Sequence, residues 1–454
     1  MMDFMVGEPL PADYGKFLMA ELLLDGEDPF TQPGLQEIPP QIRDTFHVIV
    51  IGSGMSGILA AYRLKEAGIA YTVIEKNENV GGTWYENTYP GCRVDNPNHT
   101  YSYSFKPQDW PKIFSPQPVL REYFTRCADE FGIRSNIRFN TSVVSTEYDE
   151  TTNTWAVSVA GQDGVRETLQ ANAIISAVGQ LNRPKLPEIE GRESFTGVSF
   201  HTARWQHEHD LSSKRIAVVG TGASAFQSVP EIAREAEEVF VFQRTPNWII
   251  HIPEYHDDYP EEGHWLNHHL PYYAKWFRLF LFWQNAEGIL KFVKKDEAWP
   301  HQTRSISALN EEIREYFTEG ITKIVGEDKE LLEKCILGIT IPQFPNLFCM
   351  YGPNTNIVAN GSSIFFSECE MRYILGCIEM LLKTGHAALE CKQSVHDTYN
   401  QWVDAGNLNR PWGAPHVKSW YKSIKGRVSQ NWPFTLLEFW NQTQFPEQSD
   451  YTWY

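Results

Sequence analysis

The chain has 454 residues, of which 42% are hydrophobic and 21% charged. This length suits two or three domains, and the composition excludes an intrinsically disordered protein. The formal net charge of −18 comes without any run of basic residues, which argues against nucleic-acid binding. The seven cysteines are dispersed and form no CxxC pair, so we expect a reducing compartment, no metal site and no dithiol redox site. Because we find no secretory signal and no stretch of roughly 18 apolar residues, we expect a cytoplasmic protein without a membrane span.

The first part of the chain contains a β-α-β unit. Residues 1–44 are predicted to form an N-terminal extension, and 45–190 the first part of an FAD-binding domain. A continuous apolar run at 46–52 predicts a buried parallel strand, 53–68 a turn and a helix, and 70–76 a second strand. This order predicts an α/β fold of the Rossmann type.

The turn of this unit fits a phosphate-binding loop. Gly52, Gly54 and Gly57 form a GxGxxG pattern, in which the glycines permit a tight turn and a close approach of pyrophosphate to the helix N-terminus. Glu75 closes the next strand about 20 residues on, where an acid can bind a ribose hydroxyl. A glycine turn without a ligand is the alternative interpretation. The flanking strand and helix favour a site for the ADP half of FAD.

A second β-α-β unit follows later in the chain. Alternating residues over 143–161 predict a β-hairpin, and 171–179 predicts another buried strand. The second unit occupies 214–244. It lies within 191–335, which we interpret as a linker, an NADP-binding part and a helical region. The remainder, 336–454, is predicted to return to the FAD domain.

The second unit favours NADP over NAD. Its turn at 220–225 keeps two glycines and has alanine in third place, an allowed variant. Its second strand ends in Arg244 rather than in an acid, and a guanidinium can pair with a 2′-phosphate. An arginine that only caps the strand is the alternative. The residues expected to bind this cofactor are Gly220, Thr221, Gly222, Ser224, Ala225, Arg244 and Thr245.

Two further segments have a clear pattern. The apolar stretch 276–283 is too short for a membrane span and is predicted to be the buried face of a helix, although a surface that contacts membrane or an apolar substrate is the alternative. A helix is predicted from about 366 to 384.

Two longer motifs carry a family resemblance. The stretch "FTGVSFHTARWQ" at 195–206 matches FxGxxxHxxxW, with glutamine where the family usually has proline or aspartate. The stretch "GGTWYENTYPGCRVD" at 81–95 matches GGxWxxxxYPGxxxD. In both, the chain resembles the Baeyer–Villiger monooxygenases, which are class B flavoprotein monooxygenases, and most closely the hydroxyacetophenone-type branch. The fingerprint residues are Phe195, Gly197, His201 and Trp205, and the cofactor-binding residues of the second motif are Gly82, Thr83, Trp84 and Asp95.

The resemblance implies two Rossmann-like domains, one for FAD and one for NADP. It implies that NADPH reduces the flavin, that O2 then forms a peroxyflavin, and that this species attacks a ketone to give an ester or lactone. It implies that Asp95 is a catalytic acid near the flavin that interacts with an active-site arginine. It also implies that His201 and Trp205 lie in an inter-domain linker that organises domain movement. The sequence leaves the ketone and the oligomeric state open.

The residues around Asp95 support part of this interpretation. Asp95 follows a turn and neighbours Arg93, and a carboxyl beside a cation is expected to have a low pKa. An ordinary turn aspartate is the alternative.

One departure from the family pattern affects the second domain. The stretch 327–335 runs directly into 336–348, and a segment on the order of one hundred residues is expected to be missing there, about the size of a small domain. That segment carries the active-site arginine in the family, and no other arginine here matches it. The remaining sheet is expected to have two strands and an open edge. Alternative functions are therefore an oxygenase of nitrogen or sulfur, a flavin-binding protein without activity, and an uncoupled NADPH oxidase.

Overall fold

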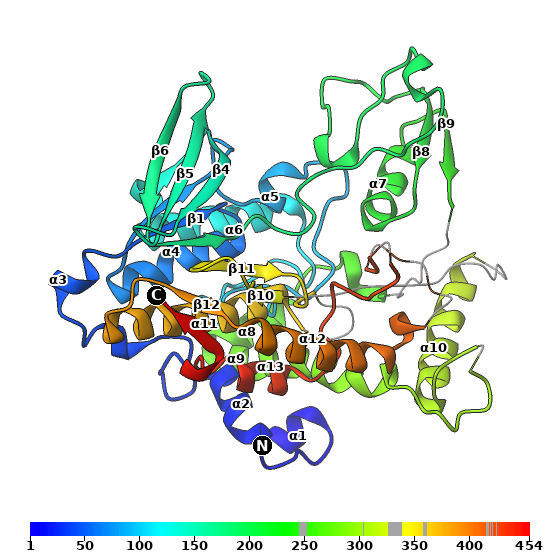
Figure 1. Cartoon of the computed structure of the whole chain (residues 1–454). Helices are drawn as coiled ribbons and strands as arrows, with labels where there is room; N and C mark the ends of the chain where they lie inside the picture. Colours follow the sequence, from blue (N-terminus) through cyan, green and yellow to red (C-terminus); the bar gives the residue numbers. More distant parts are fainter. Residues whose placement is uncertain are drawn as a thin grey trace.

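The computed structural model describes residues 1–244, 252–302, 304–325, 338–356, 361–414, 417, 419, 421–423 and 425–454. Its centre is a six-stranded sheet of strand order β10-β11-β7-β1-β2-β3, in which β10 is antiparallel and the other strands are parallel (Figure 1). The strands are β1 (His47–Ile51), β2 (Ala70–Ile74), β3 (Ile137–Arg138), β7 (Ala173–Ser176), β10 (Gly338–Thr340) and β11 (Leu347–Gly352). The predicted parallel α/β architecture is confirmed.

The central sheet is covered on both faces, which explains why the middle of β1, with Val48, Ile49 and Val50, is apolar and fully buried. On one face, Val48 and Val50 pack with helices α4 (Met55–Ala67), α6 (Gln117–Glu130) and α11 (Ser363–Thr384). On the other face, Ile49 and Ile174 pack against Trp155 of a three-stranded antiparallel sheet. This second sheet contains the predicted hairpin and consists of β4 (Thr141–Asp149), β5 (Thr154–Gly161) and β6 (Arg166–Ala171). The predicted helix at 366–384 is confirmed and begins three residues earlier.

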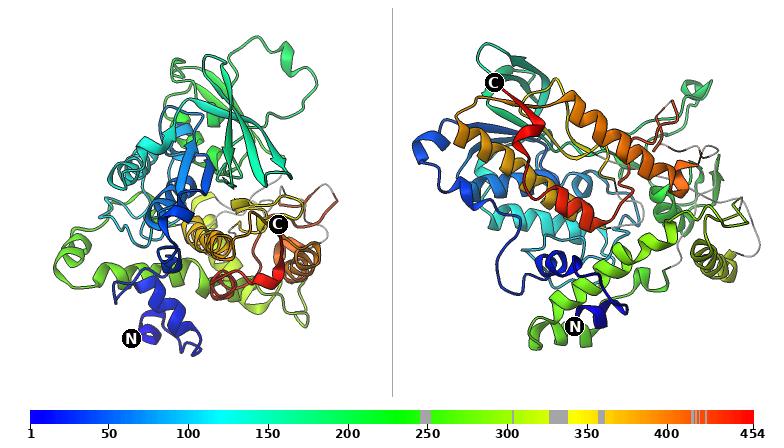
Figure 2. Two further views of the ribbon diagram at one scale, coloured as in Figure 1. Left: turned by 60° about the vertical axis from the view of Figure 1, so that its left-hand side comes forward. Right: turned by 60° about the horizontal axis from the view of Figure 1, so that its bottom comes forward.

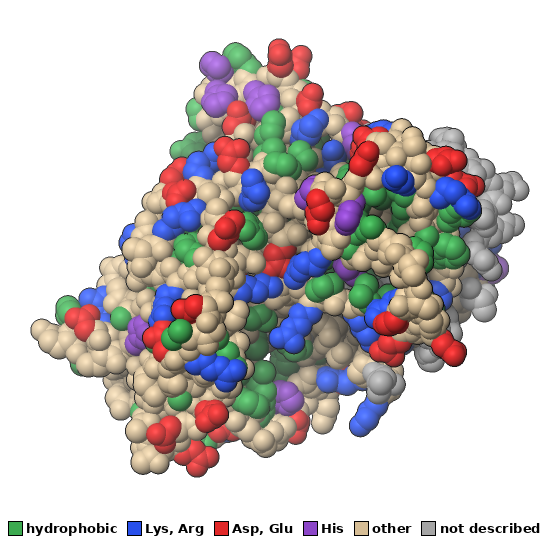
Figure 3. Space-filling model, turned by 90° about the horizontal axis from the view of Figure 1, so that it is seen from above, with side chains coloured by type: hydrophobic (Ala, Val, Ile, Leu, Met, Phe, Trp, Pro, Cys, Tyr) green, Lys and Arg blue, Asp and Glu red, His purple; other side chains and the backbone are tan. Residues whose placement is uncertain are grey.

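The second β-α-β unit stands apart from this core, at the upper right of Figure 1. It consists of β8 (Arg215–Val219), α7 (Ala223–Ala233) and β9 (Glu238–Phe242), with the two strands parallel. Within the described residues its sheet has two strands, and Val219 and Phe242 are 60% and 57% exposed. Seen from above in Figure 3, hydrophobic side chains reach the surface among acidic and basic ones. Two strands and one helix cannot bury both faces of such apolar strands.

A second core joins the N-terminal extension to the helical part and to the C-terminal part of the chain. Phe17 lies on α2 (Tyr14–Leu22). The centroid of its ring lies 5.8 Å from that of Phe282 and 5.9 Å from that of Phe365, both in edge-to-face arrangements. Figure 2 shows α1 (Met2–Val6) and α2 beside α9 (Tyr273–Asn285). Further helices are α3 (Pro40–Arg43), α8 (Glu261–His269), α10 (Ala308–Val325), α12 (Gln393–Leu408) and α13 (Leu436–Gln442). Strand β12 (Leu389–Cys391) pairs with β13 (Tyr451–Trp453). The stretch 276–283 lies in α9 with most of its large side chains buried.

A search of the described helices finds none long and apolar enough to cross a membrane.

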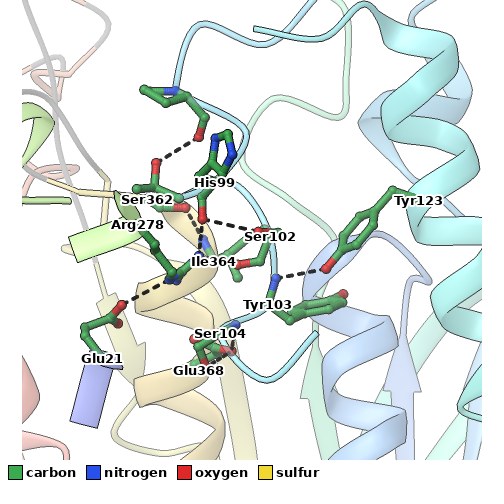
Figure 4. A network of polar contacts seen from close by, with 12 residues as sticks. Glu21, His99, Ser102, Tyr103, Ser104, Tyr123, Arg278, Ser362, Ile364 and Glu368 are labelled. Carbon is green, nitrogen blue, oxygen red and sulfur yellow. Dashed lines mark hydrogen bonds and ion pairs between the residues drawn. The ribbon is translucent and has the colours of Figure 1, made fainter. Parts of the chain in front are cut away.

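Buried polar side chains connect these two cores (Figure 4). Arg278 of α9 forms an ion pair with Glu21 of α2 at 3.3 Å and donates hydrogen bonds to the carbonyl oxygens of His99 and Ser102. Glu368 of α11 accepts hydrogen bonds from the amide and hydroxyl of Ser104, both at 2.9 Å. The loop at 95–104 is therefore held by residues of the extension, the helical region and the C-terminal part.

The Glu21–Arg278 pair is expected to be a large determinant of stability, because both side chains are at most 9% exposed. Replacing Glu21 by Gln leaves the guanidinium buried without its counter-charge, which typically costs about 3–5 kcal/mol. We expect Glu21→Gln to lower the free energy of unfolding by that order, as measured by urea denaturation. The exposed Glu27→Gln is the matched control, with an expected change within about 0.5 kcal/mol. Equal stability of the two variants would show that the pair contributes little.

Burial raises the pKa of both Glu368 and Glu370 from 4.5 to about 8. Between these values the folded state keeps protons that the unfolded state releases, so the free energy of unfolding falls as pH rises from about 4.5 to 8. Glutamine is neutral at every pH. We therefore expect Glu368→Gln to resemble wild type at pH 5 and to be more stable at pH 9 by roughly 1–3 kcal/mol.

Urea titrations at the two pH values measure this difference, and the exposed Glu147→Gln should show none. A wild-type advantage at pH 9 would contradict the assigned protonation.

Candidate active site and dinucleotide cradles

The first glycine turn closes by direct backbone contact. Gly52 has φ +99°, and a Cβ at Gly57 would lie 1.9 Å from the carbonyl oxygen of Gly52. Gly82 has φ +53°, and its Cβ would lie 2.8 Å from the Cα of Gly54. Side chains at these positions would force apart β1, α4 and the turn at 81–82. The turn thus leaves the N-terminus of α4 open to a phosphate group.

Glu75 anchors the same turn from the end of β2. The Oε2 atom of Glu75 accepts hydrogen bonds from the amide of Ser53 at 2.7 Å and from the hydroxyl of Ser53 at 2.8 Å. The Oε1 atom of Glu75 accepts a hydrogen bond from the amide of Asn77 at 2.8 Å. Each carboxylate oxygen has two acceptor sites, so Oε1 can still accept a bond from a ribose hydroxyl. The glycine turn at 52–57 and the N-terminus of α4 form what we call the first cradle. Together with the buried carboxylate of Glu75, they provide the donors and acceptors that an adenosine diphosphate group requires.

The stretch at 81–95 begins at this cradle. The amide of Gly81 donates to the carbonyl oxygen of Ser53 at 3.0 Å. Helix α5 (Thr83–Glu86) follows, with Thr83 exposed and Trp84 buried. The indole of Trp84 donates to the hydroxyl of Tyr101 at 3.1 Å. The predicted second-motif residues Gly82 and Trp84 therefore lie beside the first cradle.

Asp95 lies at the far end of this stretch, and its surroundings differ from the sequence expectation. Its side chain reaches solvent, but the surrounding protein removes much of its hydration and raises the pKa of the carboxyl above its ordinary value. Arg93 does not pair with it. The guanidinium of Arg93 instead donates to the carbonyl oxygen of Tyr255 at 2.8 Å and lies over the Tyr255 ring. The expectation of a low pKa was wrong, because the neighbouring cation points to another element.

Among the described residues no ion pair to Asp95 is found. The carboxyl interacts electrostatically with Tyr101 and Tyr255. It is thus a carboxyl that takes up a proton more readily than an ordinary aspartate, at a solvent-facing position between the two β-α-β units.

The second cradle is open. Gly220 has φ +105°, and a Cβ at Gly220 or Gly222 would meet no heavy atom within 4 Å. The amide of Ala225 donates to the carbonyl oxygen of Gly222 at 2.9 Å as α7 begins, and the side chain of Gln243 donates to the hydroxyl of Thr221 at 3.0 Å. Arg244 is exposed at the end of β9. Thr245 lies outside the described residues.

The fingerprint residues lie in the part of the chain between the two β-α-β units. His201 begins a short helical turn at Thr202–Arg204, where its Nδ1 accepts the amide hydrogen of Ala203 at 3.1 Å, and burial together with Arg204 lowers the pKa of the imidazole. The ring of Trp205 packs on Phe200 and against the main core. The ring of Phe195 is 65% exposed and lies over Gly197. A salt bridge of 2.9 Å joins Arg204 to Glu86 of the first unit.

The sequence did not single out Gln227, which lies on α7 three residues beyond Ser224. Its amide contacts Tyr89, Arg93 and Tyr255. Gln227 follows Ser224 by about one helical turn, so both residues lie on the same face of α7. This helical spacing could have identified Gln227 from the sequence.

Comparison with known proteins gives the chain a family. A profile of the FMO-like family, described as flavin-binding monooxygenase-like, matches residues 45–266. A Baeyer–Villiger monooxygenase of Streptomyces coelicolor is 30% identical over 90% of this chain and 93% of its own length. An uncharacterized monooxygenase of Sinorhizobium fredii, y4iD, is 29% identical over 98% of this chain and 80% of its own length. That alignment has 534 positions against 454 residues, so at least 80 positions hold a residue of the relative alone.

Solved structures share the fold. An oxidized steroid monooxygenase bound to NADP superposes with a TM-score of 0.70 at 21% identity, covering 89% of this chain and 99% of that chain. An OTEMO complex with FAD and NADP has a TM-score of 0.69 at 21% identity, covering 88% and 97%.

The two cradles predict opposite responses to the same substitution. Gly57→Ala places a Cβ against the Gly52 carbonyl, so we expect it to destabilise the fold by about 1–3 kcal/mol. In Gly222→Ala the new methyl group meets only open space at φ −73°, so we expect the stability to stay within about 1 kcal/mol of wild type. We expect the affinity for NADP+ to fall at least about tenfold, because the methyl group occupies the approach of the phosphate. Thermal unfolding and NADP+ titration separate these effects. Unchanged NADP+ affinity in Gly222→Ala would contradict the second cradle.

Proposed function

This chain belongs to the Baeyer–Villiger monooxygenase family, and from that premise we propose that it is an FAD- and NADPH-dependent enzyme that inserts one oxygen atom of O2 into ketones to give esters or lactones. One observation carries the proposal. The stretch at 81–95 contacts the first cradle through Gly81 and Ser53, and it contacts the second unit through Tyr89 and Gln227 at 2.8 Å. The two cofactor cradles therefore lie on either side of the loop that ends at Asp95.

The residues that hold each cofactor follow from the cradles. The turn of Gly52, Gly54 and Gly57 holds the pyrophosphate of FAD, and Glu75 holds its ribose. The turn at 220–225 holds the pyrophosphate of NADPH, and Arg244 pairs with its 2′-phosphate. When bound, the flavin accepts a hydride from NADPH and activates O2, which is chemistry that protein side chains do not supply.

The role of Asp95 is to hold a proton at the reacting centre. A carboxyl whose pKa is raised because the surrounding protein removes part of its hydration carries a proton closer to neutral pH than an ordinary aspartate. It can then donate that proton to an oxygen atom that gains negative charge, and such proton transfers contribute about 10²–10⁴ in rate. Its solvent-facing position leaves room for a substrate beside it.

A second candidate function, a peroxide-releasing NADPH oxidase, is favoured by the state of the second unit. The alignment with y4iD leaves at least 80 positions without a residue of this chain, and the apolar strands β8 and β9 are exposed. Both observations agree with the segment expected to be missing between residues 335 and 336, a junction that lies outside the described residues. Among the described residues no cation pairs with Asp95. An oxyanion that lacks one such donor typically reacts about 10²–10³ times more slowly, which allows peroxide to escape.

The decisive assay follows NADPH consumption under air with an aryl ketone, measuring ester and hydrogen peroxide in the same sample. We expect purified protein to retain FAD and to form ester. We expect Asp95→Ala to keep its FAD but to form ester about 10² times more slowly, because the proton donor is lost. The exposed Asp163→Asn is the control and should behave as wild type.

The outcomes separate the candidates. Peroxide equal to the NADPH consumed, with no ester, would replace the first function by the oxidase. A protein that takes up no FAD would contradict both.

A further inference from the structure

The side-chain amide of Gln227 joins helix α7 of the second β-α-β unit to the turn at 89–93 and to Tyr255. Its Oε1 accepts hydrogen bonds from the hydroxyl of Tyr89 at 2.8 Å and from the amide of Arg93 at 3.4 Å. Its Nε2 donates to the carbonyl oxygen of Arg93 and to the hydroxyl of Tyr255, both at 2.9 Å. A glutamine amide has two donors and two main acceptor positions, so every position is used by groups from outside α7.

The backbone at Gln227 lies equally close to the first unit. A Cβ at Gly91 would lie 2.2 Å from the carbonyl oxygen of Gln227, and Gly91 has φ +77°. The hydroxyl of Tyr89 also interacts with Ser224, a residue of the second cradle. Helix α7 therefore rests on the turn at 89–93 with no space for a side chain between them.

The contacts of Gln227 differ in kind from the other contacts between the units. The Arg204–Glu86 salt bridge and the hydrogen bond of 2.8 Å between His207 and Thr88 involve side chains that are partly or largely exposed. The side chain of Arg204 is 44% exposed and that of Glu86 is 12% exposed, so solvent screens their salt bridge in part, and the bond between His207 and Thr88 is exposed. The bonds of Gln227 are partly buried and directional, so they determine how α7 is placed on the turn.

We propose that Gln227 is a positioning residue that places the NADPH cradle on the loop leading to Asp95. This inference rests on the proposed function, because the position of α7 affects NADPH binding only if the second cradle holds NADPH and the loop ends at the reacting centre. A shift of α7 must break the four bonds of Gln227 or move the turn at 89–93. The affinity for NADP+ and its placement relative to the flavin therefore depend on an amide that touches neither cofactor.

The principal test is Gln227→Leu, which keeps the size of the side chain and removes its four hydrogen bonds. We expect FAD content and melting temperature close to wild type, and an affinity for NADP+ lower by about tenfold, followed through the change in flavin absorbance. The KM for NADPH should rise more than kcat falls at saturating NADPH. Gln162→Leu removes a glutamine from an exposed hairpin turn and should leave all of these values unchanged.

A second readout needs no NADPH. Amide hydrogen exchange of residues 89–95, measured without NADP+, should be faster in Gln227→Leu than in wild type, because the turn loses its anchor on α7. If wild-type protein binds no NADP+ but this exchange still increases in the variant, the proposed function fails and the positioning contact stands as a structural one.

Tyr255→Phe gives a milder variant in case Gln227→Leu folds poorly. It removes one hydroxyl from the network, and we expect the NADP+ affinity to fall by about threefold. In the Gln227→Leu background the same change should have no further effect, because its partner is gone. Unchanged NADP+ affinity and unchanged exchange in both single variants, or fully additive effects in the double variant, would overturn the proposal.

Discussion

The contact between β1 and α4 is the constraint on which the rest of the structure depends. The two elements approach so closely that a Cβ at Gly57 would lie 1.9 Å from the carbonyl oxygen of Gly52. Helix α4 thereby lies on the sheet, and α6 and α11 pack beside it over Val48 and Val50. The same approach leaves the N-terminus of α4 open at the end of β1, where a parallel α/β sheet binds its ligand. Packing and cofactor binding thus follow from one backbone contact.

The second β-α-β unit repeats the turn without repeating the packing. In the first unit, strands on both sides and layers on both faces bury Val48, Ile49 and Val50 of β1 completely. In the second, β8 and β9 keep their apolar sequence while Val219 and Phe242 remain largely exposed. The described part of this unit has little core of its own, so its placement depends on contacts with its neighbour. This explains why the amide of Gln227 and the close approach at Gly91 carry so much of the connection between the cradles.

The polar network around Arg278 has a comparable role for the loop that follows Asp95. Glu21, Arg278 and Glu368 come from three distant parts of the chain, and together they bind the carbonyl and amide groups of residues 99–104. The buried guanidinium of Arg278 and the buried carboxylate of Glu21 are costly to desolvate, so each is stable only while the other is present. Glu368, whose pKa burial raises to about 8, holds the loop as a hydrogen-bond acceptor. The N-terminal extension is therefore part of the structure that holds the loop at 95–104.

The sequence by itself determined the two β-α-β units, the hairpin, a helix from about 366 to 384 and both glycine turns, because these depend on glycine positions and apolar periodicity over short stretches. Only the tertiary structure decided what surrounds Asp95. Arg93 is two residues away, yet its guanidinium binds Tyr255, and the surrounding protein raises the pKa of the Asp95 carboxyl, which the sequence predicted to be low.

The tertiary structure also decided the partners of Gln227 and the pairing of Glu21 with Arg278, which are 257 residues apart. Such contacts depend on how elements are packed in space, and no local pattern encodes them.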